Sequence, residues 1–287
     1  MQATERVPNP NRWWLRLYGR HRPPQVIFLH GAVGDHTGWN RVLRVLREVD
    51  PEIRTYASID LPGHGHSAGP ACASVEEYAQ ELAAFLQSCY SPPWVLVGHS
   101  MGGAIAIEAA LRHPDLWVGL VLVSTGARLR VHPDLLDRLD RGAKREAIEW
   151  LMAWLFGPQA PESVRAQSRA RLEQVPLDTL RRDYSACHTF DRMNDLGAIR
   201  TPTLVVGALQ DLMTPPKYSY YLAEHIPGAR LMMVPDAGHM LPVEAPDELA
   251  HAIREFLTSI REFGSPNDRI PECLDSRTDA FSHGAER

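Results

Sequence analysis

Three residues of the chain have the types and the order that nucleophilic acyl transfer requires. Ser100 lies in the segment GHSMG at residues 98–102, and Asp211 and His239 follow it along the chain. A serine hydroxyl is a weak nucleophile until a base takes its proton and a carboxylate orients that base. We therefore predict Ser100 as the nucleophile, His239 as its base and Asp211 as the acid that orients the base.

The surroundings of Ser100 favour a nucleophile elbow, which is a sharp turn between a strand and a helix. An apolar run at 94–97 predicts the strand, and an Ala- and Ile-rich stretch at 102–112 predicts the helix. At so tight a turn, side chains at 98 and 102 would collide with neighbouring backbone, and both positions are glycine. The alternative is a glycine-rich helix start in which Ser100 is only the cap.

Asp211 and His239 each follow a predicted strand, at 203–206 and 230–234. The order serine, acid, histidine along the chain is the one that accompanies a nucleophile elbow. The other candidate carboxylates are less suited. Asp236 is expected to shape the turn before His239, while Asp191 and Asp195 precede the strand at its wrong end.

An oxyanion needs backbone donors next to the nucleophile. The N–H of Met101, which follows Ser100, is the first expected donor. The second is expected in the segment HGAVG at 30–34, where Ala32 is preferred to Val33. Inside the elbow, His99 is expected to pack away from the nucleophile.

Apolar side chains near these loops and in the middle of the chain predict a substrate pocket with an adaptable surface. The alternative for each is ordinary core packing. The predicted pocket residues are Val33, Trp39, Val131, Trp150, Trp154, Met213 and Met240.

Short apolar runs that alternate with helical patterns predict an α/β fold with a mostly parallel central sheet flanked by helices. The runs lie at 25–29, 54–59, 94–97, 120–123, 203–206 and 230–234, and 13–18 is a further candidate strand. Helical patterns lie at 37–48, 74–88, 102–112, 218–225 and 246–261.

The alternation stops between residues 126 and 195, where helical segments rich in Trp, Leu and Arg replace it. We predict a helical cap there, over the edge of the sheet where ligands bind, with crossover helices as the alternative. The expected division is a flexible arm at 1–12, a core at 13–125 and 196–262, the cap at 126–195 and a disordered tail at 263–287.

Over residues 13–262 the chain resembles the α/β-hydrolase superfamily, in its branch of serine esterases and enol-lactonases. The resemblance is carried by HG at 30–31, DLPGHGHS at 60–67, GHSMGG at 98–103, TPTLVVG at 201–207 with Asp211, and GH at 238–239. It implies the fold, the triad and a cap. One departure is that a single strand, instead of two, is clear before the first of these motifs.

The bulk composition excludes several other functions. A net charge of −5 gives no basic surface for nucleic acid. The four cysteines are scattered, and the HGH of residues 64–66 lacks a third ligand, so neither a disulfide framework nor a metal site is expected. No cofactor is implied.

No apolar run could span a membrane, and no secretion signal is visible, so a cytoplasmic protein is expected. The oligomeric state stays open.

These observations predict a serine hydrolase that cleaves a carboxylic ester of a small or medium apolar substrate through an acyl-enzyme. An enol-lactonase, a thioesterase or a C–C bond hydrolase could use the same triad. Residues 120–128 resemble enol-lactonases, whereas His99 and Met240 stand where C–C hydrolases commonly have Asn and Trp. A ligand-binding protein without catalysis on the same fold is the remaining alternative.

Overall fold

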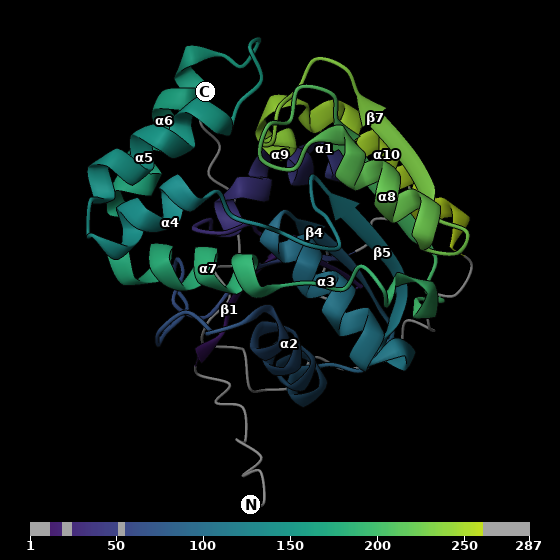
Figure 1. The fold of residues 1–287 in the computed structure, drawn as a ribbon. Coiled ribbons are helices and arrows are strands. Elements are labelled where there is room, and N and C mark those ends of the chain that lie inside the picture. Colours follow the sequence, from purple (N-terminus) through teal and green to yellow (C-terminus); the bar gives the residue numbers. More distant parts are fainter. Residues whose placement is uncertain (1–11, 19–24, 51–54, 261–287) are drawn as a thin grey trace, which may run out of the picture.

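The computed structural model describes residues 12–18, 25–50 and 55–260 (Figure 1). The predicted tail at 263–287, and all of the predicted arm except Arg12, lie outside these residues. Among the described residues no helix has the length and apolar character needed to cross a membrane.

A seven-stranded sheet organises the molecule, in the order β1-β3-β2-β4-β5-β6-β7. Only β1, at one edge, is antiparallel to its neighbour. It is also the one strand that precedes β2 in the described part of the chain, as the sequence indicated. The strands are β1 (Trp14–Tyr18), β2 (Val26–Leu29), β3 (Tyr56–Asp60), β4 (Trp94–His99), β5 (Trp117–Val123), β6 (Thr203–Ala208) and β7 (Arg230–Val234).

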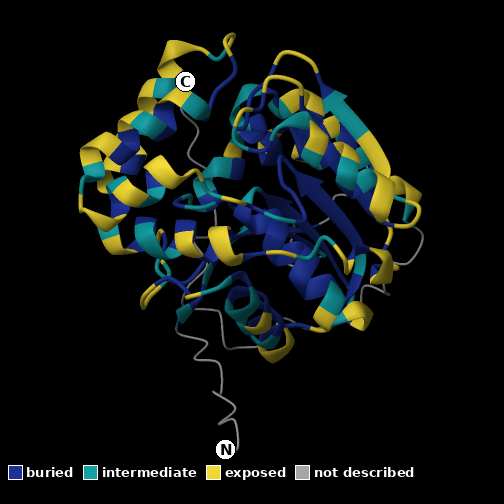
Figure 2. Ribbon diagram, viewed as in Figure 1, coloured by how far each residue is buried: buried dark blue, intermediate teal, exposed yellow. Residues whose placement is uncertain are grey.

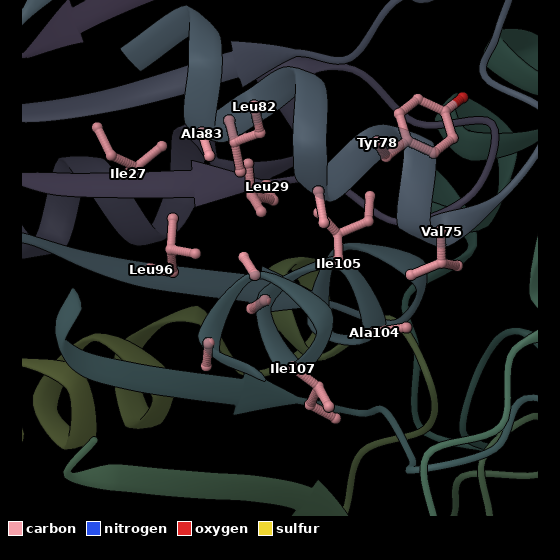
Figure 3. Close-up of a cluster of buried hydrophobic side chains, with 14 of the residues drawn as sticks. Ile27, Leu29, Val75, Tyr78, Leu82, Ala83, Leu96, Ala104, Ile105 and Ile107 are labelled. Atoms are coloured by element: carbon pink, nitrogen blue, oxygen red, sulfur yellow. The ribbon is translucent and has the colours of Figure 1, made fainter. Parts of the chain in front are cut away.

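Helices cover both faces of this sheet. Because side chains alternate along each strand, the strands supply two hydrophobic cores, one on each face. In β2, Ile27 and Leu29 pack against α2 (Val75–Cys89) and α3 (Met101–Arg112), as Figure 3 shows for the first core. Val26 and Phe28 point to the other face, toward α1 (Asn40–Val49) and α10 (Pro246–Ser259). The remaining core elements are the helices α8 (Pro216–His225) and α9 (Leu241–Glu244), with short 3-10 helices at His36–Trp39, Pro114–Leu116 and Leu196–Ala198.

The central strands β2, β3 and β4 are buried along their whole length, and β5 is nearly so, as expected for a parallel sheet with two covered faces (Figure 2). The same expectation is wrong for β7. This strand lies at the edge of the sheet, so Arg230 and Leu231 are exposed and only Val234 is fully buried.

The segment between β5 and β6 contains four cap helices, which are α4 (Pro133–Asp140), α5 (Lys144–Trp154), α6 (Glu162–Gln174) and α7 (Leu177–Thr189). Together they form a layer beside the core, with a hydrophobic cluster of their own and exposed outer faces (Figures 1 and 2). The chain leaves and rejoins the core at one place, because Arg192 N–H donates to Ala127 O at 2.7 Å and Arg128 bridges to Asp191.

A buried carboxylate fixes the point where the chain returns from the cap. Glu108 of α3 is 1% exposed, and its oxygens accept hydrogen bonds from Arg192 at 2.6 and 3.1 Å and from Arg112. Burial alone raises the pKa of Glu108, but the two guanidinium groups outweigh it and hold the pKa below its ordinary value. The charged carboxylate therefore ties the end of the cap to the helix that follows the proposed nucleophile.

Replacing Arg192 with Met should lower the free energy of unfolding by about 1–3 kcal/mol at neutral pH, because a buried carboxylate then loses its main donor. The control Arg112→Met should cost less than about 1 kcal/mol, since the Arg112 side chain is 45% exposed and that of Arg192 only 25%. Urea denaturation measures both values.

The depressed pKa of Glu108 also sets the pH dependence of this difference. A carboxyl group with a lowered pKa in the folded state stabilises the fold above its unfolded pKa of about 4.3, and this contribution disappears as the pH falls through the folded value. The difference in the free energy of unfolding between wild type and Arg192→Met should therefore become smaller in acid. An equal difference at pH 7 and in strong acid would contradict the claim that the charged Glu108 holds Arg192.

Candidate active site

Ser100 lies between the end of β4 and the start of α3, with backbone angles φ 51° and ψ −115°. Few residues other than glycine adopt a positive φ. A Cβ atom at Gly98 would lie 2.2 Å from the carbonyl oxygen of Gly102, and one at Gly102 would lie 2.5 Å from that of Leu29. The predicted elbow and its need for two glycines are thus confirmed.

The three residues that the sequence singles out lie together. His239 Nε2 is 2.9 Å from Ser100 Oγ, and His239 Nδ1 is 3.0 Å from Asp211 Oδ2. Because a carboxylate only accepts, Nδ1 carries the proton and Nε2 is free to accept from the serine hydroxyl. Asp211 and His239 are both nearly fully buried. This is the geometry in which a histidine takes the proton of a serine.

The topology of the sheet explains why these residues meet. β4, β6 and β7 run parallel, so the loops that follow them leave the sheet at one edge. Backbone hydrogen bonds join the last two loops, since Leu209 N–H donates to Val234 O at 2.9 Å and Gln210 N–H to Ala237 O at 3.1 Å. Asp211 is therefore held at a fixed distance from His239.

Thr214 completes the support of Asp211, and the sequence analysis missed this role. Its N–H donates to Asp211 Oδ1 and its hydroxyl to Oδ2, both at 2.8 Å. Burial alone raises the pKa of Asp211, but the His239 ring and the two Thr214 donors outweigh it, and the pKa lies below its ordinary value. A threonine three residues after an aspartate in a loop is the signal that could have predicted this turn.

The other candidates for these roles are placed elsewhere. Asp236 is exposed, and Asp191 pairs with Arg128 at the surface. His99 donates from Nε2 to the backbone oxygen of His239 at 2.8 Å. Burial, and then the neighbouring His239, lower the pKa of His99 to about 3. His99 is thus a neutral residue that supports the backbone of His239.

Two backbone N–H groups beside Ser100 have no acceptor among the described residues. They belong to Met101, at the start of α3, and to Ala32. The N–H of Val33 is already used, because it donates to Asp183 at 2.6 Å. Of the two donors that the sequence left open in this loop, the geometry therefore favours Ala32.

A cavity of about 280 Å³ opens in front of Ser100 and His239, between the core loops and the cap. Six predicted pocket residues line it, namely Trp39, Val131, Trp150, Trp154, Met213 and Met240. Val33 does not line this cavity. It packs among the hydrophobic residues of the cap and lines a neighbouring cavity, which shares Ala32, Tyr184 and Met240 with the first.

The walls of this cavity are largely apolar and aromatic. Trp150 and Trp154 stack with their ring centres 4.9 Å apart. Leu129, Leu135, Tyr184 and Tyr218 also contribute, and the sequence analysis missed them because the packing of the cap decides which residues face inward. Arg130 and Lys217 lie at the exposed rim.

The histidines of the HGH segment do not converge on a common point. His64 Nε2 faces Asp183 at 2.8 Å, whereas the ring of His66 packs against Trp14. Within the described ranges, two other groups have the spacing of metal ligands, which are Asp35, His36 and Asp60, and Cys72, Glu77 and Glu81. Asp60 already accepts from the N–H groups of His36 and His66 at 2.6 and 2.9 Å.

Known proteins resemble this chain over most of its length. A lipase of Mycobacterium tuberculosis, LipV, is 29% identical over 264 residues, which cover 85% of this chain and 97% of the lipase. The pimeloyl-[acyl-carrier protein] methyl ester esterase of Nitrosomonas europaea is 26% identical over 240 residues, 78% of this chain and 92% of the esterase. The solved structure of a thermophilic esterase superposes with a TM-score of 0.73 at 32% identity, covering 86% of this chain and 94% of that one.

The family itself follows from a match to a family model. Residues 26–252 fit the family model described as the alpha/beta hydrolase family, and this range contains the elbow, the loops of Asp211 and His239, and the cap helices. The mostly parallel sheet and the helices of the cap are as the resemblance implied, and the single strand before β2 in the described residues is the departure that the sequence indicated. The chain is a hydrolase and belongs to the alpha/beta hydrolase family.

Proposed function

We propose that this hydrolase cleaves a carboxylic ester of a small or medium apolar substrate through an acyl-enzyme on Ser100. The observation that carries the proposal is the continuous set of hydrogen bonds from Asp211 to His239 to Ser100, which ends in an apolar cavity of about 280 Å³. Relatives whose names give them lipase or methyl ester esterase activity support the choice of an ester.

The first half of the reaction forms the acyl-enzyme. Ser100 Oγ attacks the ester carbonyl carbon while His239 Nε2 takes its proton, and the new charge on the carbonyl oxygen is stabilised by the N–H groups of Ala32 and Met101. Met101 stands at the start of α3, where the helix dipole adds to this stabilisation. The tetrahedral intermediate then collapses, and His239 gives its proton to the departing alcohol.

The second half releases the acid. Water attacks the acyl-enzyme while His239 again takes a proton, and the same two N–H groups hold the second oxyanion. Collapse of this intermediate returns the proton to Ser100 Oγ and frees the carboxylic acid. The buried Asp211 stabilises the charged form of His239 in both halves.

The cavity supports a limit on substrate size. The volume in front of Ser100 lies just below the roughly 300–1,000 Å³ typical of small-molecule sites. The stacked pair of Trp150 and Trp154, with Leu135, offers a rigid apolar wall from the cap. A short or medium acyl chain, or an aryl group, fits such a space better than a long fatty acyl chain.

Hydrolysis of p-nitrophenyl acetate, butyrate, octanoate and palmitate should show an optimum at butyrate or octanoate and little turnover of palmitate. Ser100→Ala should abolish turnover of every ester and keep the thermal unfolding of the wild type, because the change removes only the attacking oxygen. Turnover that survives in Ser100→Ala would refute the nucleophile. No turnover of any ester by the wild type would refute the ester assignment, and it would favour a lactone, a thioester, a C–C substrate or a binding role.

Asp211→Asn should lower kcat by about 10³- to 10⁴-fold with little change in KM, because an amide can donate to His239 Nδ1 and so leave the proton on Nε2, where it blocks the base. The matched control is Asp236→Asn, which removes an exposed carboxylate from the same loop region and should leave kcat within about twofold. Steady-state kinetics of both variants on one ester provide the comparison. An unchanged kcat in Asp211→Asn would mean that another group orients His239.

A further inference from the structure

A carboxylate of the cap lies outside the proposed triad but next to the oxyanion loop. Asp183 belongs to α7 and is fully buried. Its Oδ2 accepts from Val33 N–H at 2.6 Å and lies 2.8 Å from His64 Nε2, while its Oδ1 accepts from the hydroxyl of Tyr78 at 3.0 Å. One cap side chain thus holds three segments of the core.

The partner His64 is a charged donor. Its Nδ1 lies 3.0 Å from the carbonyl oxygen of Pro62 and its Nε2 faces the carboxylate, and neither oxygen can donate. Both ring nitrogens must therefore carry protons. Burial lowers the pKa of His64, but the charge of Asp183 outweighs burial and raises it above the ordinary value. Asp183 and His64 form an ion pair whose side chains are 0% and 1% exposed.

The neighbouring His30 shows the opposite state. Its Nδ1 donates to Gly31 O at 2.8 Å, and its Nε2 accepts from Leu61 N–H at 3.1 Å. Burial, and then the nearby His64, lower the pKa of His30 to about 4. The positive charge in this region is therefore localised on His64, opposite Asp183.

The hydrogen bond to Val33 acts on a strained backbone. Val33 has φ 56°, a conformation that β-branched residues rarely adopt. Its N–H belongs to the peptide plane that follows Ala32, and the N–H of Ala32 belongs to the plane before it. Because only the two dihedral angles of Ala32 join these planes, a fixed Val33 N–H limits the directions that the Ala32 N–H can take.

We propose that Asp183 is a positioning residue for the oxyanion hole. Through Val33 it fixes the loop of residues 31–34 so that the Ala32 N–H faces the reacting carbonyl, and the hole is complete only while α7 is seated on the core. The inference rests on the proposed function, since it assigns Asp183 a role in the same reaction. An oxyanion donor acts mainly in the transition state, so its misplacement lowers kcat more than it changes KM.

Tyr78 provides a matched control. Its ring belongs to the buried hydrophobic cluster beneath α2. Figure 3 shows its hydroxyl pointing away from Leu29 and Leu82. Tyr78→Phe removes one hydrogen bond between the core and Asp183 but leaves those to Val33 and His64 in place. This variant therefore measures how much kcat falls when the cap is loosened but the loop of residues 31–34 stays bound to Asp183.

The test measures kcat and KM of Asp183→Ala, Asp183→Asn and Tyr78→Phe on p-nitrophenyl butyrate, with circular dichroism as the check of folding. Asp183→Ala should lower kcat about 10- to 100-fold, less than the full loss of an oxyanion donor, with KM within about threefold. Asp183→Asn should recover most of kcat, because an amide oxygen can still accept from Val33 N–H. Tyr78→Phe should stay within about threefold of wild type in kcat. Asp183→Ser carries the same prediction as Asp183→Ala and replaces it if the alanine variant does not fold.

An unchanged kcat in folded Asp183→Ala would overturn the inference. An equal loss of kcat in Tyr78→Phe would also overturn it, because it would show a general effect of the cap. A higher KM at constant kcat in Asp183→Ala would overturn it too, because Asp183 would then only shape the pocket. The rate at which a fluorophosphonate modifies Ser100 gives the same comparison without any ester substrate, because the phosphonyl oxygen occupies the oxyanion hole. A wrong substrate assignment is thereby distinguished from a wrong role for Asp183.

Discussion

The whole site depends on a close approach of backbone to backbone beneath Ser100. The start of α3 lies so near to β4 and to the end of β2 that no side chain fits at residues 98 and 102. This contact holds Ser100 in its positive φ and presents Oγ at the sheet edge with the helix start behind it. Strain of this kind persists only where the surrounding packing fixes it, and here the buried strands β2, β4 and β5 supply that packing.

Around this fixed point, the other groups are held by hydrogen bonds within loops and between loops that are distant in sequence. His99 holds the backbone of His239, Thr214 holds Asp211, and Asp183 holds the loop of Ala32. Each of these residues orients a group that we propose to act in the reaction. The core thus gives the rigid frame, and polar side chains buried between loops set the fine geometry.

The sequence predicted those parts of the site that local patterns determine. The elbow follows from a strand, a glycine-flanked serine and a helix, and the places of Asp211 and His239 follow from strands that end at one edge of a parallel sheet. Asp183 was missed because its partners lie in other segments of the chain, and only tertiary packing joins them. Thr214 lies only three residues after Asp211, so a local pattern could have predicted its contact, and it was overlooked. Val33 lines a neighbouring cavity instead of the one in front of Ser100, and its positive φ has no signal in the sequence.

The most direct test of the account is to locate the reactive nucleophile chemically. The protein is treated with a fluorophosphonate, digested, and the modified peptide is identified by mass spectrometry, with His239→Ala in parallel. The account predicts a single adduct on Ser100 in the wild type and a strongly reduced yield in His239→Ala, because the serine then lacks its base. An adduct on another residue, or equal labelling of both proteins, would contradict the claim that His239 activates Ser100.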